Sequence, residues 1–350
     1  MLTKDSFYDM RFDSIQTLRG IAAVLVVLEH VRFFNRGAFG VDIFFCISGF
    51  MIMLTTQKNT DYFFRKRLLR IVPFYYLMTF VTYACLIFLP GLFEQTSAAP
   101  QFLVKSLLFI PFDIGGGVLQ PLLRIGWTVN CEMFFYLLFG ISLRISRRYR
   151  GLVCSALLCA LTLAGIFIPS SFAPFSFYSS PVMLEFTLGI LVFYAAKGLY
   201  RLHCGGRLPN WLWPPCLFLS VGLFACLIWS KHHINVLGLR RVLYWGLPAA
   251  VIVLAFFLCG LQVRMPKWSV LLGNISFSIY LVHYYPILFI DRKVCSFETL
   301  SLSSLMGAAV SLLFVLLLSW AAWYVVEKRF TGWLRGKIIH AAPEAAHPGP

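Results

Sequence analysis

Residues 242–261, VLYWGLPAAVIVLAFFLCGL, form a run of twenty residues that contains no charged side chain. Coiled as a helix with a rise of about 1.5 Å per residue, this run is about 30 Å long. That length matches the hydrocarbon core of a lipid bilayer. A helix that is apolar on every face is typical of a buried or membrane-spanning position. The run therefore predicts a transmembrane helix.

Nine further stretches of the chain are apolar over a similar length. They lie at 14–33, 40–56, 71–90, 126–143, 151–168, 181–196, 213–230, 268–290 and 300–326. The segment 102–112 is also apolar, but it is short and contains Lys105 and Pro111, which predicts an interfacial or re-entrant segment. We therefore expect an all-α integral membrane protein, built as a bundle of about ten transmembrane helices.

The composition of the whole chain agrees with a membrane protein. Of its 350 residues, 59% are hydrophobic and only 13% are charged, whereas soluble proteins carry about 25% charged residues. No polar stretch is long enough for a separate soluble domain. We therefore expect one transmembrane domain over residues 1–337 and a short disordered tail over 338–350. The cysteines and histidines show no spacing suited to zinc, so no metal site is predicted.

The distribution of basic residues indicates the orientation in the membrane. With the N-terminus inside, the cytoplasmic segments hold twenty Lys and Arg side chains and the outer segments hold nine. This bias predicts that both termini are cytoplasmic, although the outer loop 231–241 is itself basic. The formal net charge of +16 also suits a nucleic-acid binder. We exclude that class because the basic residues lie in short loops between apolar spans, as topology signals do.

Ionisable side chains inside the expected spans are the main functional signal, because they are unfavourable in lipid. Arg19 and His30 are eleven residues apart, within about 20° of three full helical turns. They therefore share one helix face and are separated by about 16 Å along it. An arginine and an imidazole placed in this way could hold the two ends of a long ligand. The alternative is that Arg19 snorkels to one interface and His30 lies at the other.

Five ionisable groups on five expected spans fall in the outer half of the bilayer. They are His30, Asp42, Glu132, Glu185 and His283. A shared depth predicts a common polar cavity in which a carboxylate orients an imidazole. The alternative is that each group reaches the outer interface separately. Glu29 lies 100° around the helix from His30, so it is not expected to orient that ring.

The inner loop before the third span carries a second signal. Arg67 and Arg70 are three residues apart, so they share a face at the cytoplasmic mouth of this span. Together with Arg65 and Lys66 they could bind a phosphorylated cytosolic ligand. The alternative is that these residues only anchor the helix at the cytoplasmic interface.

Five segments together resemble the acyltransferase-3 family of membrane acyltransferases. In chain order they are Arg19-Gly20 followed by His30, GVDIFFCISGFMI (40–52), FFRKRLLRIVP (63–73), WTVNCEMFFYLLF (127–139) and LGNISFSIYLVHYYPI (272–287). The departures from the family pattern are Thr128 for a usual serine, Phe277 for a usual tyrosine, and Met133 for a second acidic residue. The last departure argues against a mechanism that needs two adjacent carboxylates.

The resemblance implies an O-acyltransferase similar to the exopolysaccharide O-acetyltransferase branch of the family. Such an enzyme moves an acetyl or similar short acyl group from cytosolic acyl-CoA to a sugar hydroxyl of an exported polysaccharide or surface glycolipid. Acetyl-CoA would be a co-substrate, with no tightly bound cofactor. The expected location is a bacterial cytoplasmic (inner) membrane, in contact with membrane lipid. A second copy of the chain and the polysaccharide-assembly machinery are further candidate partners.

The family motifs also imply roles for individual residues. The expected roles are co-substrate binding by Arg19, Arg67 and Arg70, catalysis by His30 with Asp42 or Glu132, and sugar binding by His283 and Glu185. His30 would act as a general base on the sugar hydroxyl, or become transiently acylated. Asp42 or Glu132 would orient its imidazole.

Two other classes of function remain open at the level of the sequence. Intramembrane His, Glu and Arg residues also suit a proton-coupled transporter or flippase of a lipid-linked saccharide, although the chain has no internal repeat and no paired broken helices. A non-catalytic membrane subunit of a polysaccharide-assembly complex is the other alternative. Transfer of acetyl by the purified protein separates an enzyme from both.

Overall fold

The computed structural model describes residues 7–8, 11–89, 97–113, 117–168, 170–209, 211–234 and 237–340. These residues are almost entirely helical. The exception is one short antiparallel pair of strands, β1 (Phe112–Asp113) and β2 (Leu119–Gln120). The expectation of an all-α membrane protein is therefore confirmed.

Eight helices of the described chain are long and apolar enough to cross a membrane. They are built on α2 (Gly40–Lys58), α3 (Phe63–Phe88), α5 (Trp127–Ile145), α6 (Arg150–Phe167), α8 (Leu184–Cys204), α9 (Trp213–His233), α11 (Leu247–Gln262) and α15 (Leu302–Ala322). A ninth span is bent by 52° and consists of α12 (Lys267–Asn274) followed by α13 (Ser276–Val282) and α14 (Tyr284–Lys293). In order, these nine spans match the second to the tenth expected spans.

The first expected span is α1 (Asp13–Glu29), a helix of 17 residues. It is about 26 Å long and ends four residues before the expected boundary. Glycines allow its neighbours to pack closely against it, because small residues let helix backbones approach. A Cβ at Gly273 of α12 would lie 1.8 Å from the carbonyl oxygen of Gln16, and one at Gly40 would lie 2.6 Å from that of Ala22.

The expected non-spanning segment contains α4 (Pro100–Leu107), a helix of only eight residues. After it, Phe109 adopts a positive φ of 58°, and its ring stacks on Tyr75 of α3 with the ring centroids 5.0 Å apart. The hydroxyl of Tyr178, in the short helix α7 (Ala173–Tyr178), donates to the Phe109 carbonyl oxygen. These contacts hold the segment against α3 and α7.

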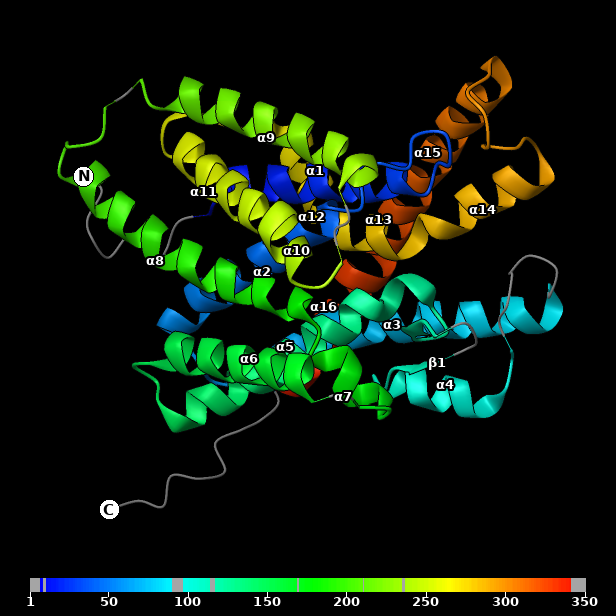
Figure 1. Cartoon of the computed structure of the whole chain (residues 1–350), viewed down its shortest axis with the longest axis horizontal. Helices are drawn as coiled ribbons and strands as arrows, with labels where there is room; N and C mark the ends of the chain where they lie inside the picture. Colours follow the sequence, from blue (N-terminus) through cyan, green and yellow to red (C-terminus); the bar gives the residue numbers. More distant parts are fainter. Residues whose placement is uncertain are drawn as a thin grey trace.

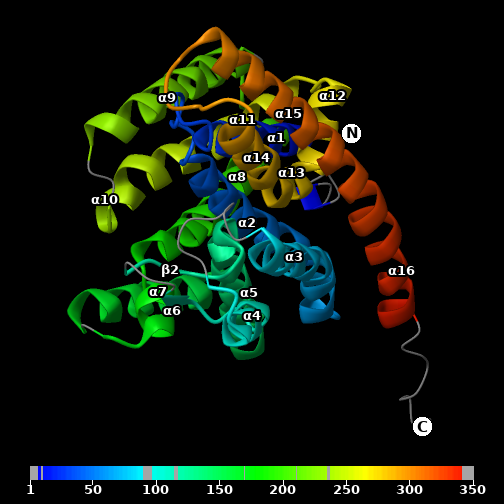
Figure 2. The same ribbon diagram turned by 90° about the vertical axis from the view of Figure 1, so that its right-hand side faces the viewer.

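The last helix is longer than expected. It continues from α15 through η6 (Trp323–Phe330), α16 (Thr331–Arg335) and η7 (Gly336–His340), so one unbroken helix runs from Leu302 to Ile338. At about 55 Å it exceeds the thickness of a bilayer, and it appears as the long helix that descends beside the bundle in Figure 2. Residues 338–340, expected in a disordered tail, continue this helix. The rest of the expected tail, 341–350, lies outside the described residues.

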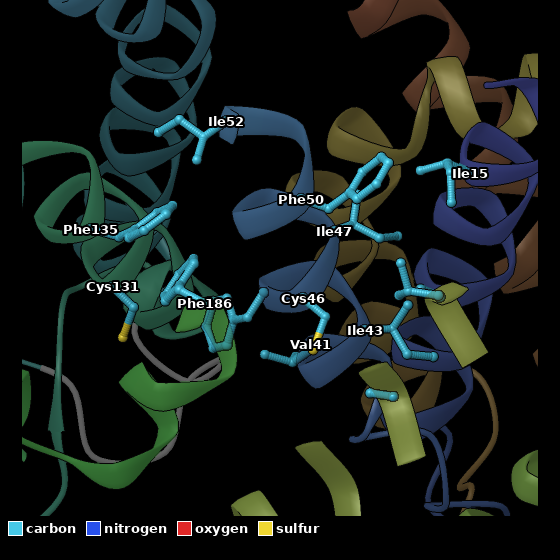
Figure 3. Packing of buried hydrophobic residues seen from close by; sticks show 14 of the residues in the cluster. Ile15, Val41, Ile43, Cys46, Ile47, Phe50, Ile52, Cys131, Phe135 and Phe186 are labelled. Atoms are coloured by element: carbon cyan, nitrogen blue, oxygen red, sulfur yellow. The ribbon is translucent and has the colours of Figure 1, made fainter. Parts of the chain in front are cut away.

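The helices form two groups with α2 and α8 between them. Figure 1 shows α1, α9 and α11 to α15 in one group, and α3 to α7 in the other. Gly49 of α2 and Gly189 of α8 let these two helices touch, since a Cβ at either position would lie within 2.2 Å of a backbone oxygen of the other helix. Figure 3 shows α2 at the centre of the apolar core, with Phe50 on the side of α1 and Phe186 on the side of α5.

Candidate active site

A small cavity lies between the two helix groups. It is lined by α1, α2, α3, α5 and α13 and has a volume of about 60 Å³, which is room for a few water molecules. Its polar lining residues are Arg19, Ser48, Arg67, Arg70, Thr128, Glu132, Tyr136, Ser276 and Tyr280. Along α2 the lining extends from Met51 to Val41, a distance of about 15 Å. The residues that line the cavity therefore extend over about half the thickness of a bilayer core.

Three arginines give this cavity its charge. Arg67 donates from Nη2 to Thr55 Oγ1 at 2.5 Å, and its guanidinium lies 5.4 Å from the centre of the Tyr136 ring. Arg19 and Arg70 line this cavity and make no hydrogen bond or ion pair within the described part of the chain. Two guanidinium groups are thus available to an anionic ligand.

Glu132 is held in place by its neighbours in the cavity. Its Oε1 accepts a hydrogen bond from Ser48 Oγ at 3.1 Å and another from the Tyr136 hydroxyl. A second carboxylate, Glu327 on η6, accepts a hydrogen bond from Ser278 and interacts with the charges of Arg19 and Arg70. Glu327 was not among the expected site residues, because it lies just beyond the expected end of the last span at residue 326.

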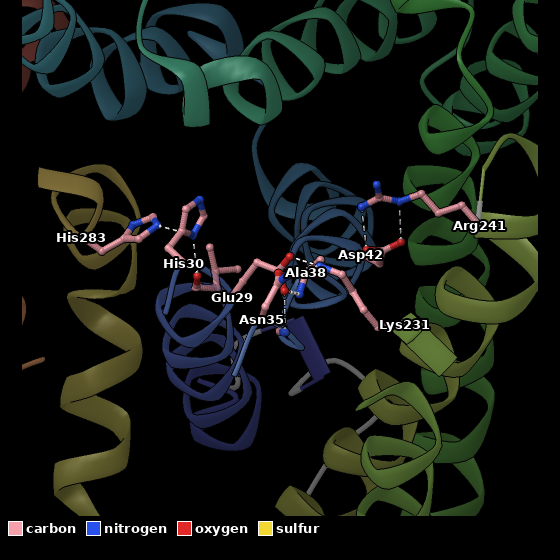
Figure 4. A network of polar contacts seen from close by, with 10 residues as sticks. Glu29, His30, Asn35, Ala38, Asp42, Lys231, Arg241 and His283 are labelled. Atoms are coloured by element: carbon pink, nitrogen blue, oxygen red, sulfur yellow. Dashed lines mark hydrogen bonds and ion pairs between the residues drawn. The ribbon is translucent and has the colours of Figure 1, made fainter. Parts of the chain in front are cut away.

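His30 and His283 form a direct pair at the outer end of α1. His30 follows the last residue of α1 and His283 connects α13 to α14. His283 Nε2 lies 3.2 Å from His30 Nδ1, as drawn in Figure 4. The second nitrogen of His283, Nδ1, lies 2.7 Å from the carbonyl oxygen of Tyr280. Nδ1 of His30 also lies 2.9 Å from the carbonyl oxygen of Val26.

These contacts determine where the protons of the two neutral imidazoles lie. A carbonyl oxygen only accepts hydrogen bonds, so Nδ1 of His283 must carry the proton. Nε2 of His283 is then an acceptor, and Nδ1 of His30 donates to it and to the Val26 carbonyl. The lone pair of His30 is consequently on Nε2, which has no hydrogen-bond partner among the described residues. A neutral imidazole with a free Nε2 can accept a proton from a substrate.

The cavity and the histidine pair meet at Tyr280. This residue lines the cavity, and its ring centroid lies 5.9 Å from that of His283. The Tyr280 hydroxyl donates to the carbonyl oxygen of Ile125 at 2.8 Å and accepts from Thr128 at 2.8 Å. His30 is not part of the cavity lining. Arg19 thus lines this cavity, whereas His30 is linked to it through His283 and Tyr280.

Asp42 binds an arginine instead of a histidine. Its two carboxylate oxygens accept from Nε and Nη2 of Arg241 at 3.0 and 2.9 Å. Glu185 lies 3.7 Å from the same guanidinium, and both carboxylates are completely buried. The guanidinium also lies 5.6 and 5.3 Å from the ring centres of Trp127 and Trp245. This is a charge cluster separate from both the cavity and the histidine pair.

These contacts explain the basic outer loop 231–241. Lys231 forms an ion pair with Glu29, whose carboxylate also accepts from the backbone N–H groups of Gly37 and Ala38 at 2.8 and 3.0 Å. Arg241 forms the bidentate pair with Asp42 (Figure 4). Lys231 and Arg241 were counted among the basic residues of the outer segments, where such residues are disfavoured. Both are counterions of carboxylates within the helix bundle.

The structure thus divides the five ionisable groups that were expected in one cavity. His30 and His283 pair with each other, Asp42 and Glu185 surround Arg241, and only Glu132 lines the cavity. Neither Asp42 nor Glu132 bonds to an imidazole, so the orienting role expected of them has no geometric support. The five groups were expected at a similar depth in the bilayer, but a similar depth does not determine which neighbouring helix each side chain faces. Among the described residues, no three His, Cys, Asp or Glu side chains are placed to hold a metal ion.

Comparisons with known proteins agree with the motifs. The acyltransferase-3 family model, described as an acyltransferase domain, matches residues 12–324. The chain is 35% identical over 264 residues to the exopolysaccharide production protein ExoZ of Rhizobium meliloti, covering 73% of this chain and 78% of that protein. It is 28% identical to the acyltransferase MdmB of Streptomyces mycarofaciens, over 79% of each chain.

A third relative extends beyond the region of similarity. The O-acetyltransferase OatA of Staphylococcus aureus is 23% identical over 82% of this chain, which spans about half (52%) of that protein. No solved structure matches the chain. The family match over most of the chain agrees with the apolar helices, the arginine-lined cavity and the histidine pair. The chain belongs to the acyltransferase-3 family and is a multi-pass membrane O-acyltransferase.

Proposed function

We propose that the protein transfers an acetyl or similar short acyl group from cytosolic acyl-CoA to a hydroxyl of an exported polysaccharide or its lipid-linked precursor. The bacterial exopolysaccharide production protein among its relatives supports this acceptor. The excess of basic residues in the expected cytoplasmic loops supports a cytoplasmic membrane location with both termini inside. The observation that carries the proposal is that Arg19, whose guanidinium has no partner among the described residues, lies on α1, the same helix that ends at His30 with its free Nε2.

The donor would enter the cavity from the cytoplasmic side. Guanidinium groups bind phosphates in bidentate geometry, and Arg19 and Arg70 have no competing partner among the described residues. Phe44 and Met51 line the cavity on α2, and the flexible thioether of Met51 can adapt its conformation to the pantetheine arm of the donor.

The transfer step would use His30 as a general base. Its Nε2 takes the proton from the sugar hydroxyl while the hydroxyl oxygen attacks the thioester carbonyl carbon. The bond between that carbon and the sulfur of CoA then breaks, and the proton passes from His30 to the thiolate. His283 stabilises the charged ring by accepting a hydrogen bond from Nδ1 of His30. His283 thus takes the orienting role that was expected of Asp42 or Glu132.

Arg70→Gln and Arg19→Gln are each expected to raise the KM for acetyl-CoA by about 10- to 100-fold, with a smaller effect on kcat. The reason is that each variant removes one charged hydrogen-bond donor, worth about 1.5–3 kcal/mol. Initial rates of the purified protein over a range of acetyl-CoA concentrations test this. Arg144→Gln is the matched control, because Arg144 is in the last turn of α5, a helix that also lines the cavity, but is exposed. A KM within twofold of the wild type in both cavity variants would contradict the donor site.

His283→Phe is expected to lower kcat by about 5- to 10-fold and to leave the KM for acetyl-CoA unchanged. Phenylalanine fills the space but cannot accept the Nδ1 proton of His30, so the variant loses a hydrogen bond worth about 1 kcal/mol. His283→Gln should recover part of the rate, since its side-chain oxygen can accept that bond. If the Phe and Gln variants are equally impaired, His283 acts only through packing.

The direct test of the proposed function is acetyl transfer by the purified protein in lipid nanodiscs. The protein should transfer acetyl from acetyl-CoA to an oligosaccharide prepared from the surface polysaccharide of its own organism. The acetylated sugar is detected by mass spectrometry. Surface polysaccharide from a strain that lacks the protein should lack the same acetyl group. A protein that moves a lipid-linked sugar across vesicles and transfers no acetyl would instead be a transporter or flippase.

A further inference from the structure

A long apolar groove lies between α14 and α15 at the surface of the bundle. The two helices are neighbours (Figure 1), and the groove between them has a volume of about 770 Å³. Ligand sites in proteins usually have volumes of about 300–1,000 Å³. Along α15 the lining of the groove extends from Ser303 to Leu318, a distance of about 22 Å. None of the side chains that line it is charged.

The groove is open to lipid and backed by packed protein. Large apolar side chains from both helices line it and are exposed at the surface of the described chain. They are Phe289, Val294, Met306, Val310, Phe314 and Leu318. Behind them, Ile290 of α14 and Val315 of α15 are buried in one apolar cluster. In a bilayer, the groove is therefore a concave surface of fixed shape that contacts hydrocarbon.

Two consecutive tyrosines connect this groove to the histidine pair. Tyr284 directly follows His283, and its ring centroid lies 5.6 Å from that of His30. Tyr285 lines the groove, and its hydroxyl oxygen lies 2.5 Å from that of Thr82 on α3. A molecule in the groove would thus lie against the helix that begins just after His283. The end of the groove at Tyr285 is adjacent to the proposed general base.

The shape and position of the groove favour a single long hydrocarbon chain as its occupant. The groove lies between two helices and is narrow, whereas a phospholipid carries two chains on one headgroup. Its length of about 22 Å exceeds the roughly 15 Å that half of the hydrocarbon core provides for a chain in one leaflet. From His283, α14 runs toward the expected outer surface, where an exported saccharide on a lipid carrier would be presented. Because lipid is as apolar as the groove, such a chain is held by close packing.

We propose that the groove binds the hydrocarbon chain of a lipid-linked acceptor, a saccharide carried on a polyprenyl phosphate or diphosphate, and thereby brings the sugar to His30. This inference rests on the proposed function and makes it more specific. It identifies the acceptor as the lipid-linked precursor, and not as the finished polysaccharide. The protein then acts on the saccharide before the lipid carrier is removed.

A photoreactive polyprenyl phosphate tests the site directly. With a diazirine group on its chain, this probe should cross-link to α14 and α15 of the purified protein in lipid nanodiscs, as mapped by mass spectrometry of the peptides. Unlabelled polyprenyl phosphate should compete with the probe, and an equal amount of phosphatidylglycerol should not. Equal competition by phosphatidylglycerol, or cross-links spread over all the lipid-facing helices, would mean that the groove holds ordinary membrane lipid and would overturn the proposal.

Val310→Trp fills the groove and is expected to lower this cross-linking by about 10- to 100-fold, the usual range for overpacking a filled site. Leu313→Trp is the matched control, because Leu313 is also exposed on α15 but does not line the groove. Both substitutions are at the lipid-facing surface, so both variants should keep the thermal unfolding midpoint of the wild type. Equal cross-linking of the two variants contradicts the assignment.

A pair of acceptors connects the groove to catalysis. They are a lipid-linked oligosaccharide and the same oligosaccharide released from its lipid. Val310→Trp should raise the KM for the lipid-linked acceptor by about 10- to 100-fold and leave the KM for the released oligosaccharide and for acetyl-CoA unchanged. An equal effect on both acceptors, or no effect on either, overturns the groove.

The two measurements separate this inference from the proposed function. If the probe cross-links in the groove as expected but the wild-type protein transfers acetyl to neither acceptor, the acyltransfer proposal fails and the lipid site stands. If the protein transfers acetyl but the probe cross-links elsewhere, the acyltransfer proposal stands and the lipid site fails.

Discussion

Replacing His30 by glutamine is expected to reduce acyl transfer by about 10²–10⁴-fold, the usual contribution of a positioned general base. The glutamine amide can keep the hydrogen bond to His283, but it has no basic nitrogen to take the proton of the sugar hydroxyl. The loss should therefore fall on kcat. The KM for acetyl-CoA should change little, because the donor-binding arginines on α1 and α3 line the cavity, whereas His30 does not.

The measurement is kcat of purified His30→Gln protein, compared with its thermal unfolding midpoint. His233→Gln is a matched histidine control, since His233 is exposed and stacks on Trp229 at 4.4 Å between ring centroids. An unfolding midpoint equal to that of the wild type, together with a kcat within threefold of it, would remove His30 from the chemistry. A stable acetylated histidine, found by mass spectrometry after rapid quenching, would replace base catalysis with a covalent route.

The membrane spans could be predicted because they depend on local composition. A run such as 242–261 contains enough apolar residues to span a bilayer whatever its neighbours are. The ends of the helices depend on contacts that composition does not contain. α1 stops at Glu29 because the chain turns back and the Glu29 carboxylate binds the N–H groups of Gly37 and Ala38. The last helix continues beyond residue 326, the expected end of the last span. Charged residues from position 327 onward end the apolar segment, but they do not end the helix, which can continue outside the bilayer.

The site was predictable in part for the same reason. The depth of a residue and its phase on one helix are local properties, and they pointed to Arg19, Arg70 and Glu132, which line one cavity. Which neighbour a side chain faces depends on how all the helices are rotated and packed. Asp42 was expected to orient His30 because their depths agree. Its real partner, Arg241, lies 199 positions away in the chain and was counted among the loop charges.

The pair Asp42–Arg241 supports a second prediction with a large effect. Arg241→Gln should destabilise the protein by about 3–5 kcal/mol, because it leaves the buried carboxylates of Asp42 and Glu185 without their cation. Asp42→Asn should cost less, because Glu185 still lies 3.7 Å from the guanidinium. The double variant should recover part of the loss caused by Arg241→Gln, since only Glu185 of the two carboxylates is then left without the arginine. Unfolding of the purified proteins in a denaturing detergent series measures this. Arg11→Gln is the control, because the pair Arg11–Asp13 is largely exposed, at 66% and 48% of the side-chain surface, and should matter little.

The double variant also decides between two roles for Asp42. If Asp42 is a counterion, Arg241→Gln loses activity only because the site is distorted, and the stability recovered in the double variant should bring a recovery of kcat as well. If Asp42 acts on His30 during catalysis, the double variant should recover stability and still be slow. The geometry favours the first outcome, because both carboxylate oxygens of Asp42 are occupied by Arg241, whereas Nδ1 of His30 is already bound to His283 and to the backbone. A stable double variant that is as slow as His30→Gln would return Asp42 to the catalytic machinery.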